Sequence, residues 1–567
     1  MPGPNLIWDR PGVVLDIQVP DAFAQPLIEA WRREILRMLP ALGWQQESTA
    51  ERRFPGGASL ALSAPIDCLF TATEVNEWAL ESAEAAVFGS ASTDFAATVV
   101  RLRQEIEAER KPRLLALRTA ATEHRVSLLA DPHLVSIGTG TGSLTWKIEE
   151  LPLAESIDWS KVHDVPAVLI TGSNGKTTST RLLTAVLTNA GRVAGMCCTD
   201  GVTVAGELVS RGDWAGPGGA RMVLQDRRVE VAVLETARGG ILRRGLAVER
   251  ATAALVTNIA EDHFGEFGIH GLEDLAQAKL VVAKALSRDG ILVLNADDPT
   301  LVSVGPSTGA TIGWFSLDPS NRVIRQAVSA GGRAVWAEDG EIRVAGWSAA
   351  DSGSTSVVRI DEIPITMKGV ARHNVANALG VTAAALALGI EPVMIRRGLL
   401  RFSGSSMENP GRLNLFDLGG VSALADFAHN PHGMDALVRM ASALPATRRL
   451  LVLGQAGDRD DAAIQEFTRS AWAFRPDQIV LKEMEPYRRG RPVGEVTELI
   501  RREFIRLGVN PASIVGEPSE YDALLAALRW ARAGDVLLLP LHAERERGLD
   551  LLDRLQRTGW KPGEVVE

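Results

Sequence analysis

The hydrophobic positions of the chain fall into short apolar runs that alternate with longer stretches of helical spacing. Residues 167–170 are an apolar run typical of a buried strand, and residues 179–189 repeat aliphatic side chains at helical spacing. Further buried strands are predicted at residues 229–234, 253–258 and 290–295, and a helix at 272–286. This alternation predicts an α/β sheet in the middle of the chain.

The flanking parts have patterns of their own. Residues 1 to about 110 predict an α+β unit, with strands at 13–19 and 59–62 and helices at 23–39, 74–87 and 96–109. A β-rich stretch is expected at 311–366. After the turn-rich residues 403–412, strands are predicted at 421–427, 449–453, 478–481 and 535–539, separated by helical patterns such as 460–472. The last part therefore predicts a second doubly wound, Rossmann-like domain.

A chain of 567 residues is too long for one hydrophobic core and suggests about three domains. We predict an N-terminal α+β domain (1–164), a central α/β domain with a phosphate loop (165–404) and a C-terminal α/β domain (405–567). No part of residues 1–110 has the spacing of a catalytic constellation. A docking or oligomerisation role is expected for that unit, and homo-oligomerisation stays open.

Charge and composition narrow the function classes. Lys and Arg number 60 against 70 Asp and Glu, and no long basic run occurs, which argues against a nucleic-acid partner. No apolar run approaches the roughly eighteen residues of a membrane span, and the first residues lack a signal-peptide pattern. We therefore expect a cytoplasmic protein without a membrane partner. The three cysteines indicate neither a disulfide framework nor a zinc site.

A phosphate-binding turn is predicted where the 167–170 strand meets the following helix. Gly172, Ser173, Asn174 and Gly175 form a small turn at a helix N-terminus, where unpaired backbone N–H groups favour an anion. Lys176 would reach terminal phosphate oxygens, and Thr177 or Thr178 would join the shell of a phosphate-bound Mg²⁺. The stretch departs from the general G-x-x-x-x-G-K-[ST] pattern, because Ile170 stands at the first glycine position.

Polar residues follow the other predicted strands. Glu235, Asn258 and Asn295 stand at strand ends, where an α/β sheet opens its binding crevice, and Asp426 and His429 do so in the last domain. His263, shortly after Asn258, is a candidate for metal or substrate contact.

Two further sets of residues leave alternatives open. Arg238 and Arg243 follow Glu235 closely and would either bind an anionic substrate or form a solvated basic face. The motif Gly138-x-Gly-x-Gly fits a β-turn or hairpin as well as a nucleotide site.

Taken together, the motifs resemble the Mur ligase superfamily. Five segments match its motifs in order over about 270 residues: Thr171-Gly-Ser-Asn-Gly-Lys-Thr-Thr, Asn258-Ile-Ala-Glu-Asp-His, Leu294-Asn-Ala-Asp-Asp-Pro, Arg372-His-Asn-Val-Ala-Asn-Ala and Asp426-Phe-Ala-His-Asn-Pro-His-Gly. Within the superfamily, the resemblance is strongest to the Mur-like C-terminal half of cyanophycin synthetases, through Arg211-Gly-Asp-Trp-Ala-Gly-Pro-Gly-Gly and Asn409-Pro-Gly-Arg-Leu-Asn-Leu. In cyanophycin synthetases, a large ATP-grasp domain follows a segment that residues 124–149 of this chain resemble. Here the phosphate loop follows within about 30 residues of that segment, so the ATP-grasp domain is expected to be missing.

The resemblance implies a role for each matching residue. It implies ATP contacts for Gly172 to Thr178, Asn258, Asn295, Arg412, Asp426 and His429. It implies two Mg²⁺ ions, one on Thr177 and Glu235 and one on His263. It implies catalytic roles for Lys176, Lys279, His263 and Arg412. Lys279 stands where several family members carry an N-carboxylated lysine, and an unmodified cation on the γ-phosphate is the alternative. Arg238, Arg243 and Asp213 are candidates for substrate contact.

The implied activity is that of an ATP-dependent ligase. An acyl phosphate would form on a small-molecule or peptide acceptor with a free carboxylate, with aspartate-containing acceptors favoured, and the amine of an amino acid would then attack it. Two alternatives stay open: a Mur-like ligase for an unrelated small acid, and a nucleotide-binding, non-catalytic partner of a polymerising ligase. Ala215 and Gly219 depart from the family's pattern, which leaves the identity of the substrate undetermined.

Overall fold

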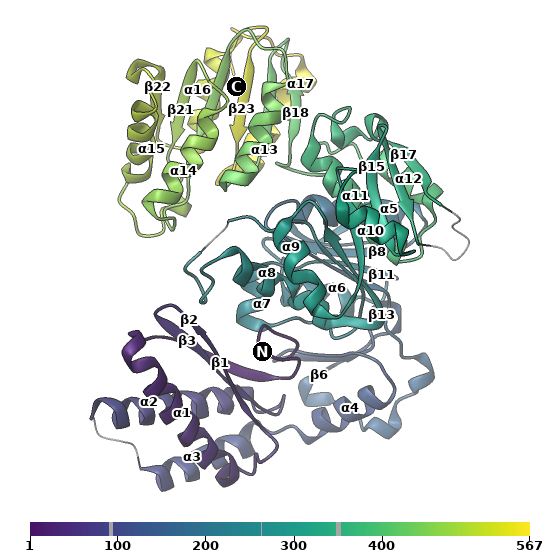
Figure 1. Cartoon of the computed structure of the whole chain (residues 1–567), viewed down its shortest axis with the longest axis vertical. Helices are drawn as coiled ribbons and strands as arrows, with labels where there is room; N and C mark the ends of the chain where they lie inside the picture. The colour runs from purple at the N-terminus through teal and green to yellow at the C-terminus, as the bar shows by residue number, and fades with distance from the viewer. Residues whose placement is uncertain (90–93, 262–263, 348–352, 567) are drawn as a thin grey trace.

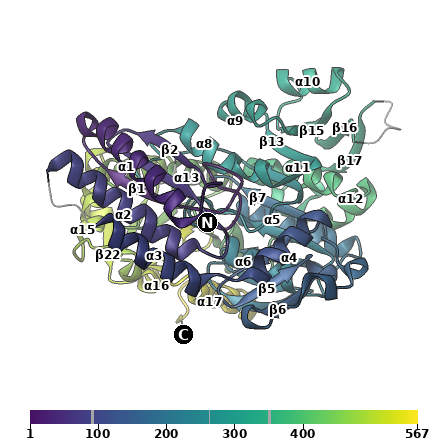
Figure 2. The ribbon, with the colours of Figure 1, turned by 90° about the horizontal axis from the view of Figure 1, so that it is seen from below.

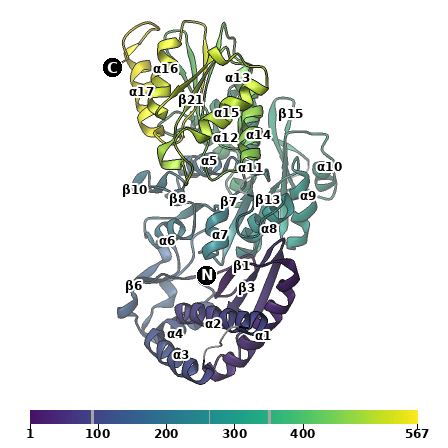
Figure 3. The same cartoon turned by 90° about the vertical axis from the view of Figure 1, so that its left-hand side faces the viewer.

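The computed structural model describes residues 1–89, 94–261, 264–347 and 353–566, and these residues form four sheets. An N-terminal region, a central region and a C-terminal region follow one another along the long axis of the molecule (Figure 1). The first residues run back from the N-terminal region and lie against the central one (Figure 3). The predicted α/β fold class is confirmed, whereas the divisions after residues 164 and 404 stay predictions.

The N-terminal sheet is antiparallel with the order β1-β3-β2. Its elements are β1 (Gly12–Gln18), α1 (Asp21–Leu42), β2 (Thr49–Phe54), β3 (Gly57–Ser63), α2 (Leu69–Phe88) and α3 (Phe95–Glu109). The helices bury their apolar faces on one side of the sheet, around the fully buried Trp31 of α1. Trp31 donates its indole N–H to Asn76 Oδ1 at 2.8 Å, and Asn76 Nδ2 donates to the Leu60 carbonyl of β3 at 3.1 Å. One buried amide therefore ties both long helices to the sheet.

A second, smaller sheet lies beside the first, beneath the central region (Figure 2). Its strands are β4 (Leu128–Ala130), β5 (Leu134–Ile137) and β6 (Leu144–Lys147), and the helix α4 (Pro112–Glu123) precedes them. The glycine-rich motif from Gly138 is the turn that joins β5 to β6, with a 3₁₀ turn at Gly140–Gly142. Between β6 and the next strand, the described residues 148–166 hold only short 3₁₀ turns. The expectation that no ATP-grasp domain separates the two regions is thus confirmed.

The central sheet has the order β10-β9-β8-β11-β7-β12-β13-β14-β15-β16-β17, and its strands from β8 to β15 in this order are parallel. The strands are β7 (Ala167–Thr171), β8 (Ala194–Cys198), β9 (Gly201–Val204), β10 (Glu207–Arg211), β11 (Val231–Glu235), β12 (Ala251–Val256), β13 (Leu286–Asn295), β14 (Thr311–Ser316), β15 (Arg333–Glu338), β16 (Glu341–Ala345) and β17 (Thr355–Arg359). The chain leaves β7 toward β8 on one side and later adds β12 on the other. Such a change of direction marks the binding crevice of an α/β sheet.

Helices cover both faces of this sheet. They are α5 (Lys176–Asn189), α6 (Pro217–Gln225), α7 (Arg238–Arg244), α8 (Leu272–Leu280), α9 (Pro299–Val304), α10 (Arg322–Ser329), α11 (Arg372–Ala387) and α12 (Pro392–Arg401). In β7, Val168 and Ile170 pack with α5, α11 and α12, while Ala167 and Leu169 pack with α6, α7 and α8 on the opposite face. A strand buried on both faces reads as a continuous apolar run, as the sequence does here.

One prediction for this region was wrong in detail. The helix expected at 272–286 ends at Leu280, and a 3₁₀ segment, Val281–Ala285, leads straight into β13. Leu286 already pairs with Ala251 of β12, so sheet pairing ends the helix although the apolar spacing continues. The stretch at 311–366 is β-rich as predicted, with β14 to β17, and it also contains the helix α10.

The C-terminal region is a sheet of order β18-β19-β23-β20-β21-β22, parallel except for β18. Its elements are β18 (Asn414–Asp417), β19 (Ser422–Asp426), α13 (Pro431–Ser442), β20 (Arg449–Leu453), α14 (Asp461–Trp472), β21 (Gln478–Lys482), α15 (Glu495–Arg506), β22 (Ile514–Glu517), α16 (Glu520–Trp530), β23 (Val536–Pro540) and α17 (Arg545–Thr558). Helices α13, α14 and α15 cover one face and α16 and α17 the other, as predicted for a doubly wound domain. Within the described residues, no helix is long and apolar enough to cross a membrane.

The buried amide of the N-terminal region generates the first prediction. Replacing Asn76 by Ala leaves the Trp31 N–H and the Leu60 carbonyl buried without these partners, which costs about 1–3 kcal/mol of unfolding free energy for each such group. Urea unfolding monitored by tryptophan fluorescence should show an earlier transition. Glu77→Ala, at an exposed position of the same helix, is the control and should leave the midpoint unchanged. Equal midpoints for both variants would contradict this account.

Candidate active site

The phosphate loop joins β7 to α5 at the carboxyl end of the central sheet. Gly172 and Gly175 have φ angles of +142° and +84°, which favour glycine. A Cβ on Gly172 would lie 1.9 Å from Thr257 Oγ1, and one on Gly175 would lie 2.3 Å from Asn377 Oδ1. Both glycines therefore allow close packing as well as the turn. Ile170 is fully buried within β7, so the position where the general motif has glycine belongs here to the core.

The segment after β12 holds the loop in place. Asn258 Oδ1 accepts a bond from the Asn174 N–H at 3.0 Å, and Asn258 Nδ2 donates to the Asn174 carbonyl at 3.0 Å. Ser173 Oγ donates to the Ala260 carbonyl and accepts from the Ala260 N–H, each at 2.9 Å. The side chains of Ser173 and Asn258 thus fix the loop, although their positions had suggested ATP contacts.

Two lysines meet at the first carbonyl of the loop. Lys176 Nζ donates to the carbonyls of Gly172 and Ser173 at 2.9 Å each, and Lys279 Nζ, from α8, donates to the Gly172 carbonyl at 2.9 Å. Lys279 is only 2% exposed. Two ammonium groups beside the N-terminus of α5 make this corner strongly attractive for a multiply charged anion.

Glu235 ends β11 directly beside the loop and is 1% exposed. Its carboxylate accepts bonds from Thr177 Oγ1 and Thr199 Oγ1, both at 2.9 Å. Burial raises the pKa of Glu235, against the opposing effect of Lys176. The Thr177 hydroxyl and this carboxylate are hard oxygen donors at the mouth of a phosphate loop. Such donors fit one Mg²⁺ whose remaining ligands come from phosphate and water.

The C-terminal region contributes the opposite wall. Arg412 is half-buried, loss of water around its guanidinium lowers its pKa, and the guanidinium lies 4.5 Å from the ring centre of Phe427. Asp426 accepts from the Leu413 N–H at 2.7 Å; burial raises the pKa of this carboxyl and Arg412 opposes the rise. His429 Nδ1 lies 3.0 Å from the Phe427 carbonyl oxygen. Across the cleft, Asn430 Nδ2 donates to Asn174 Oδ1 of the phosphate loop at 3.1 Å.

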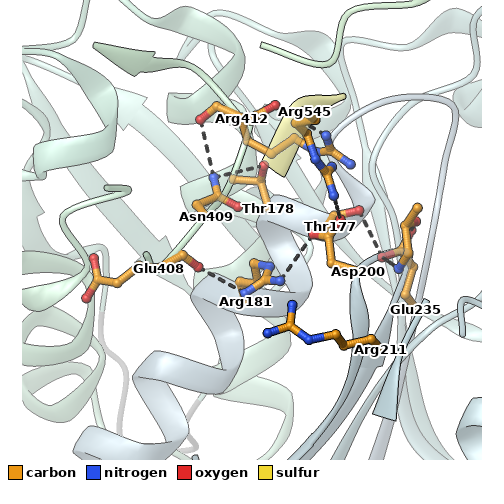
Figure 4. A network of polar contacts seen from close by, with 12 residues as sticks. Thr177, Thr178, Arg181, Asp200, Arg211, Glu235, Glu408, Asn409, Arg412 and Arg545 are labelled. Carbon is orange, nitrogen blue, oxygen red and sulfur yellow. Dashed lines mark hydrogen bonds and ion pairs between the residues drawn. The ribbon is translucent and has the colours of Figure 1, made fainter. Parts of the chain in front are cut away.

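Asp200, just after β8, joins the central and C-terminal regions (Figure 4). Its two carboxylate oxygens receive Arg545 of α17 at 2.6 Å and Arg181 of α5 at 3.1 Å, and the three side chains are between 7% and 15% exposed. Burial opposes ionisation of Asp200, but Arg412, Arg545 and Arg181 outweigh it and lower the pKa of the carboxyl. We call Asp200, Arg181 and Arg545 the interdomain triad.

The remaining candidates lie farther along the same cleft. Asn295 at the end of β13 donates to the Thr257 carbonyl at 3.0 Å and keeps a second N–H for another acceptor. Arg238 and Arg243 are on α7; Arg238 pairs with Glu266 at 2.5 Å, and the Arg243 guanidinium lies 5.1 Å from the Phe267 ring centre. Asp213 accepts from the Ala215 N–H at 3.1 Å in the loop before α6.

One continuous cavity of about 1250 Å³ collects these groups. It is lined by Ser173 to Thr178, Asp213, Glu235, Arg238, Arg243, Asn258, Lys279, Asn295, Arg412, Asp426 and His429. Its volume exceeds the roughly 300–1000 Å³ of an ordinary ligand pocket, so more than one substrate fits.

Two further sequence candidates have different outcomes. His263 is outside the described residues, so its predicted part in a second metal site stays a prediction. The Gly138-x-Gly-x-Gly turn packs against the start of β11, where Thr141 N–H donates to the Val229 carbonyl at 2.8 Å, and it does not line the cavity.

Sequence reasoning missed several residues of the cleft. Arg181 and Arg545 gave no local signal, because they meet Asp200 only in the folded chain. His373 and His432 stand within the recognised motifs but had no assigned part. Both line the cavity, and burial lowers their pKa values, to about 4 for His373.

Comparison with known families agrees with this architecture. The family model described as Mur ligase middle domain matches residues 170–385, and the model described as Mur ligase, glutamate ligase domain matches residues 411–540.

Individual relatives match over similar shares of the chain. The cyanophycin synthetase of Trichormus variabilis is 40% identical over 382 residues, which are 67% of this chain and 42% of that protein. The UDP-N-acetylmuramoyl-L-alanyl-D-glutamate--2,6-diaminopimelate ligase of Geobacter metallireducens is 27% identical over 446 residues, covering 73% of this chain and 80% of the relative. The chain thus spans about 42% of the length of the cyanophycin synthetases it matches.

Among solved structures, E. coli FolC in complex with DHPP and ADP superimposes with a TM-score of 0.51 and 21% identity. The match covers 69% of this chain and 89% of FolC. This likeness concerns the fold alone.

The close contacts of the loop glycines generate the second prediction. Gly172→Ala places a methyl group against Thr257 and should displace the loop, lowering the affinity for ATP by about tenfold or more. Gly191→Ala is the matched control, because Gly191 also has a positive φ, +81°, but has open space around its Cβ position. Titration calorimetry with ATP compares the two. Similar affinities would mean that the loop does not form the nucleotide site.

Proposed function

Since the chain belongs to the Mur ligase family, we propose that it is an ATP-dependent ligase that joins the amine of an amino acid to a carboxylate of an acidic acceptor. One observation carries the proposal: the phosphate loop and the arginines of α7 open into the same cavity. A phosphoryl donor at the loop and an anionic acceptor at α7 would therefore meet inside it. Aspartate-containing acceptors are favoured by the 40% identity with cyanophycin synthetase.

The nucleotide would lie between the central and C-terminal regions. Loop N–H groups, Lys176 and the N-terminus of α5 suit the phosphates, while the free N–H of Asn295 and the Asp426 to His429 segment suit the base and sugar. Arg412, half-buried beside Asp426 at the cavity wall, would neutralise charge that develops on the transferring phosphoryl group.

Thr177 and Glu235 would hold one Mg²⁺, which offsets phosphate charge when bound. A second ion on His263 follows from the family resemblance. Lys279 serves the same corner in either form: as an ammonium it would bind the γ-phosphate, and as a carbamate it would bind metal. Its buried position beside Gly172 is compatible with both.

The proposed reaction gives the acceptor carboxylate a good leaving group, phosphate, before the amine attacks. An acceptor carboxylate oxygen attacks the γ-phosphorus of ATP, the bond from that phosphorus to the bridging oxygen breaks, and ADP leaves. The amine nitrogen then attacks the acyl carbon, inorganic phosphate leaves, and the nitrogen gives up a proton. The protein contributes positioning and charge neutralisation, as in other phosphoryl transfers. Water must be kept out, because it would hydrolyse the acyl phosphate.

The interdomain triad supports the exclusion of water. Asp200 draws Arg545 of the C-terminal region toward α5 of the central region, and the neighbouring Thr199 bonds to Glu235. Docking of the C-terminal region and the proposed metal site are therefore linked through two adjacent residues. We propose that this docking is the closed form in which phosphoryl transfer occurs.

Phosphate release from ATP tests the activity. We expect release that requires Mg²⁺, one acceptor and one amine, in a panel of aspartate, β-aspartyl-arginine, short polyaspartate and glutamate, each with arginine, lysine or no amine. Lys176→Ala should lower the rate by about 100-fold or more, since it removes a charge aimed at the phosphates. Lys161→Ala, at an exposed lysine paired with Asp158, is the control. A product heavier by the amine minus water identifies both substrates.

The same panel separates the alternatives. Stimulated phosphate release with glutamate as the single effective acceptor would indicate a ligase for another acid. ATP binding without stimulated release by any pair would refute the ligase and favour a nucleotide-binding partner protein.

The triad generates the next prediction. Asp200→Asn removes the charge that pairs with Arg181 and Arg545 in a mostly buried setting, so kcat/KM for ATP should fall about tenfold or more. The control is Glu546→Gln, because Glu546 pairs with Arg211 across the same two regions but is 77% exposed. An exposed pair contributes little, so this variant should stay within about twofold of the parent. Equal effects of the two substitutions would exclude a special part for Asp200.

A further inference from the structure

Helix α7 depends on its surroundings for its position. It has only seven residues, Arg238–Arg244, and an isolated helix of that length is not stable in water. Yet Arg238 and Arg243 line the cavity from it, at the end proposed for the acidic acceptor. What fixes α7 therefore fixes the charges that face the acceptor.

The first residues of the chain contact the C-terminal end of α7. The Leu246 N–H donates to the Pro4 carbonyl at 2.7 Å, immediately after the helix. Gly245 has φ +71°, and a Cβ there would lie 2.8 Å from the Pro4 oxygen. Lys284 Nζ, from the segment after α8, donates to the Asn5 carbonyl at 2.8 Å. Figure 3 shows the chain start beside α7.

The β2–β3 hairpin of the N-terminal sheet contacts the other side, through the loop of residues 264–271 that precedes α8. Arg52 of β2 donates from Nη1 to the Gly268 carbonyl at 2.9 Å and from Nη2 to the Phe267 carbonyl. Phe54 packs against the same loop, 5.9 Å from the His270 ring centre, and a Cβ on Gly268 would lie 2.2 Å from its ring. The sheet lies directly below α7 and α8 (Figure 1).

The contacted loop in turn holds both arginines of α7. Glu266 pairs with Arg238 at 2.5 Å, and the Phe267 ring lies under the Arg243 guanidinium at 5.1 Å. Arg52 bonds the carbonyl of Phe267 itself and that of the next residue. A continuous set of contacts thus runs from β2, through one loop, to the two cations of the cleft.

We propose that the N-terminal domain is a positioning element for the acceptor end of the cleft, with Arg52 as the positioning residue that sets the loop 264–271 and, through it, Arg238 and Arg243. The inference rests on the proposed function for the part these arginines play in binding the acceptor. The N-terminal domain would then act within its own chain, by positioning α7, in contrast to the docking or oligomerisation role expected from the sequence. Arg52 touches neither substrate, so its loss acts on acceptor binding and leaves the nucleotide end unchanged.

The test compares neighbouring arginines in the full chain. Arg52→Ala should raise KM for the acidic acceptor by roughly 10- to 100-fold through displacement of the two cations, with KM for ATP and kcat within about twofold of the parent. Arg53→Ala is the matched control, because the Arg53 side chain is 49% exposed and pairs with Glu51 of its own strand. Arg52→Lys should recover part of the loss, because a lysine ammonium can bond to one of the two loop carbonyls but does not match the fork of the guanidinium that bonds to both.

A second pair of variants leaves the N-terminal domain untouched. Gly268→Ala puts a methyl group against Phe54, whereas Gly265→Ala, in the same loop with φ +89°, has open space around the new group. Gly268→Ala should reproduce the rise in acceptor KM, and Gly265→Ala should change it less. Equal KM values for Gly268→Ala and Gly265→Ala would overturn the proposal.

Hydrogen exchange provides a readout that needs no activity. Backbone amides of residues 264–271 and 238–246 should exchange faster in Arg52→Ala than in the parent or in Arg53→Ala. Unchanged exchange in these segments, or faster exchange with an unchanged acceptor KM, would overturn the proposal. If the parent turns over no acceptor at all, the proposed function fails, and the exchange data alone decide whether Arg52 positions α7.

Discussion

A buried carboxylate at the end of β11 imposes the main constraint on this structure. Glu235 is 1% exposed, and burying an ionised carboxylate is costly unless hydrogen bonds and cations surround it. Thr177 from the phosphate loop and Thr199 from the end of β8 supply the bonds, and Lys176 and Arg412 supply positive charge. The loop, the neighbouring strand and the C-terminal region must therefore all converge on one point of the sheet.

Each region contributes something different to the cavity that results. The central region supplies the phosphate loop and the oxygen donors suited to Mg²⁺. The C-terminal region supplies Arg412 and Asp426, which reach the cleft because Asp200 holds Arg545 against the central region. The N-terminal region supplies no lining residue named in the mechanism, and its contribution is the placement of α7. Binding of nucleotide and binding of acceptor thus rely on separate sets of contacts within one cavity.

The features that were predictable from sequence are local ones. Gly172 to Thr178, Glu235, Asn258 and Asn295 stand at the ends of apolar runs, and the ends of neighbouring parallel strands necessarily share one edge of a sheet. Asp200 and Arg545 are 345 residues apart, and Arg52 and Gly268 are 216 apart, so no spacing in the sequence connects them. The early end of α8 was hidden for a related reason: the pairing of Leu286 with Ala251 is a tertiary contact that overrides a helical pattern. The side chains of Ser173 and Asn258 brace the loop, and their ATP contacts stay a prediction.

The interdomain triad has a thermal consequence. Docking of the C-terminal region removes a carboxylate and two guanidinium groups from most of their water, and the Coulomb attraction among them must offset that loss. The penalty for stripping water from charged groups decreases as temperature rises, because the hydration of ions carries a strongly negative entropy. Warming therefore shifts the balance toward the docked arrangement, up to the temperature at which the regions themselves unfold. Buried charge therefore continues to gain strength at temperatures where the hydrophobic stabilisation of an apolar contact levels off.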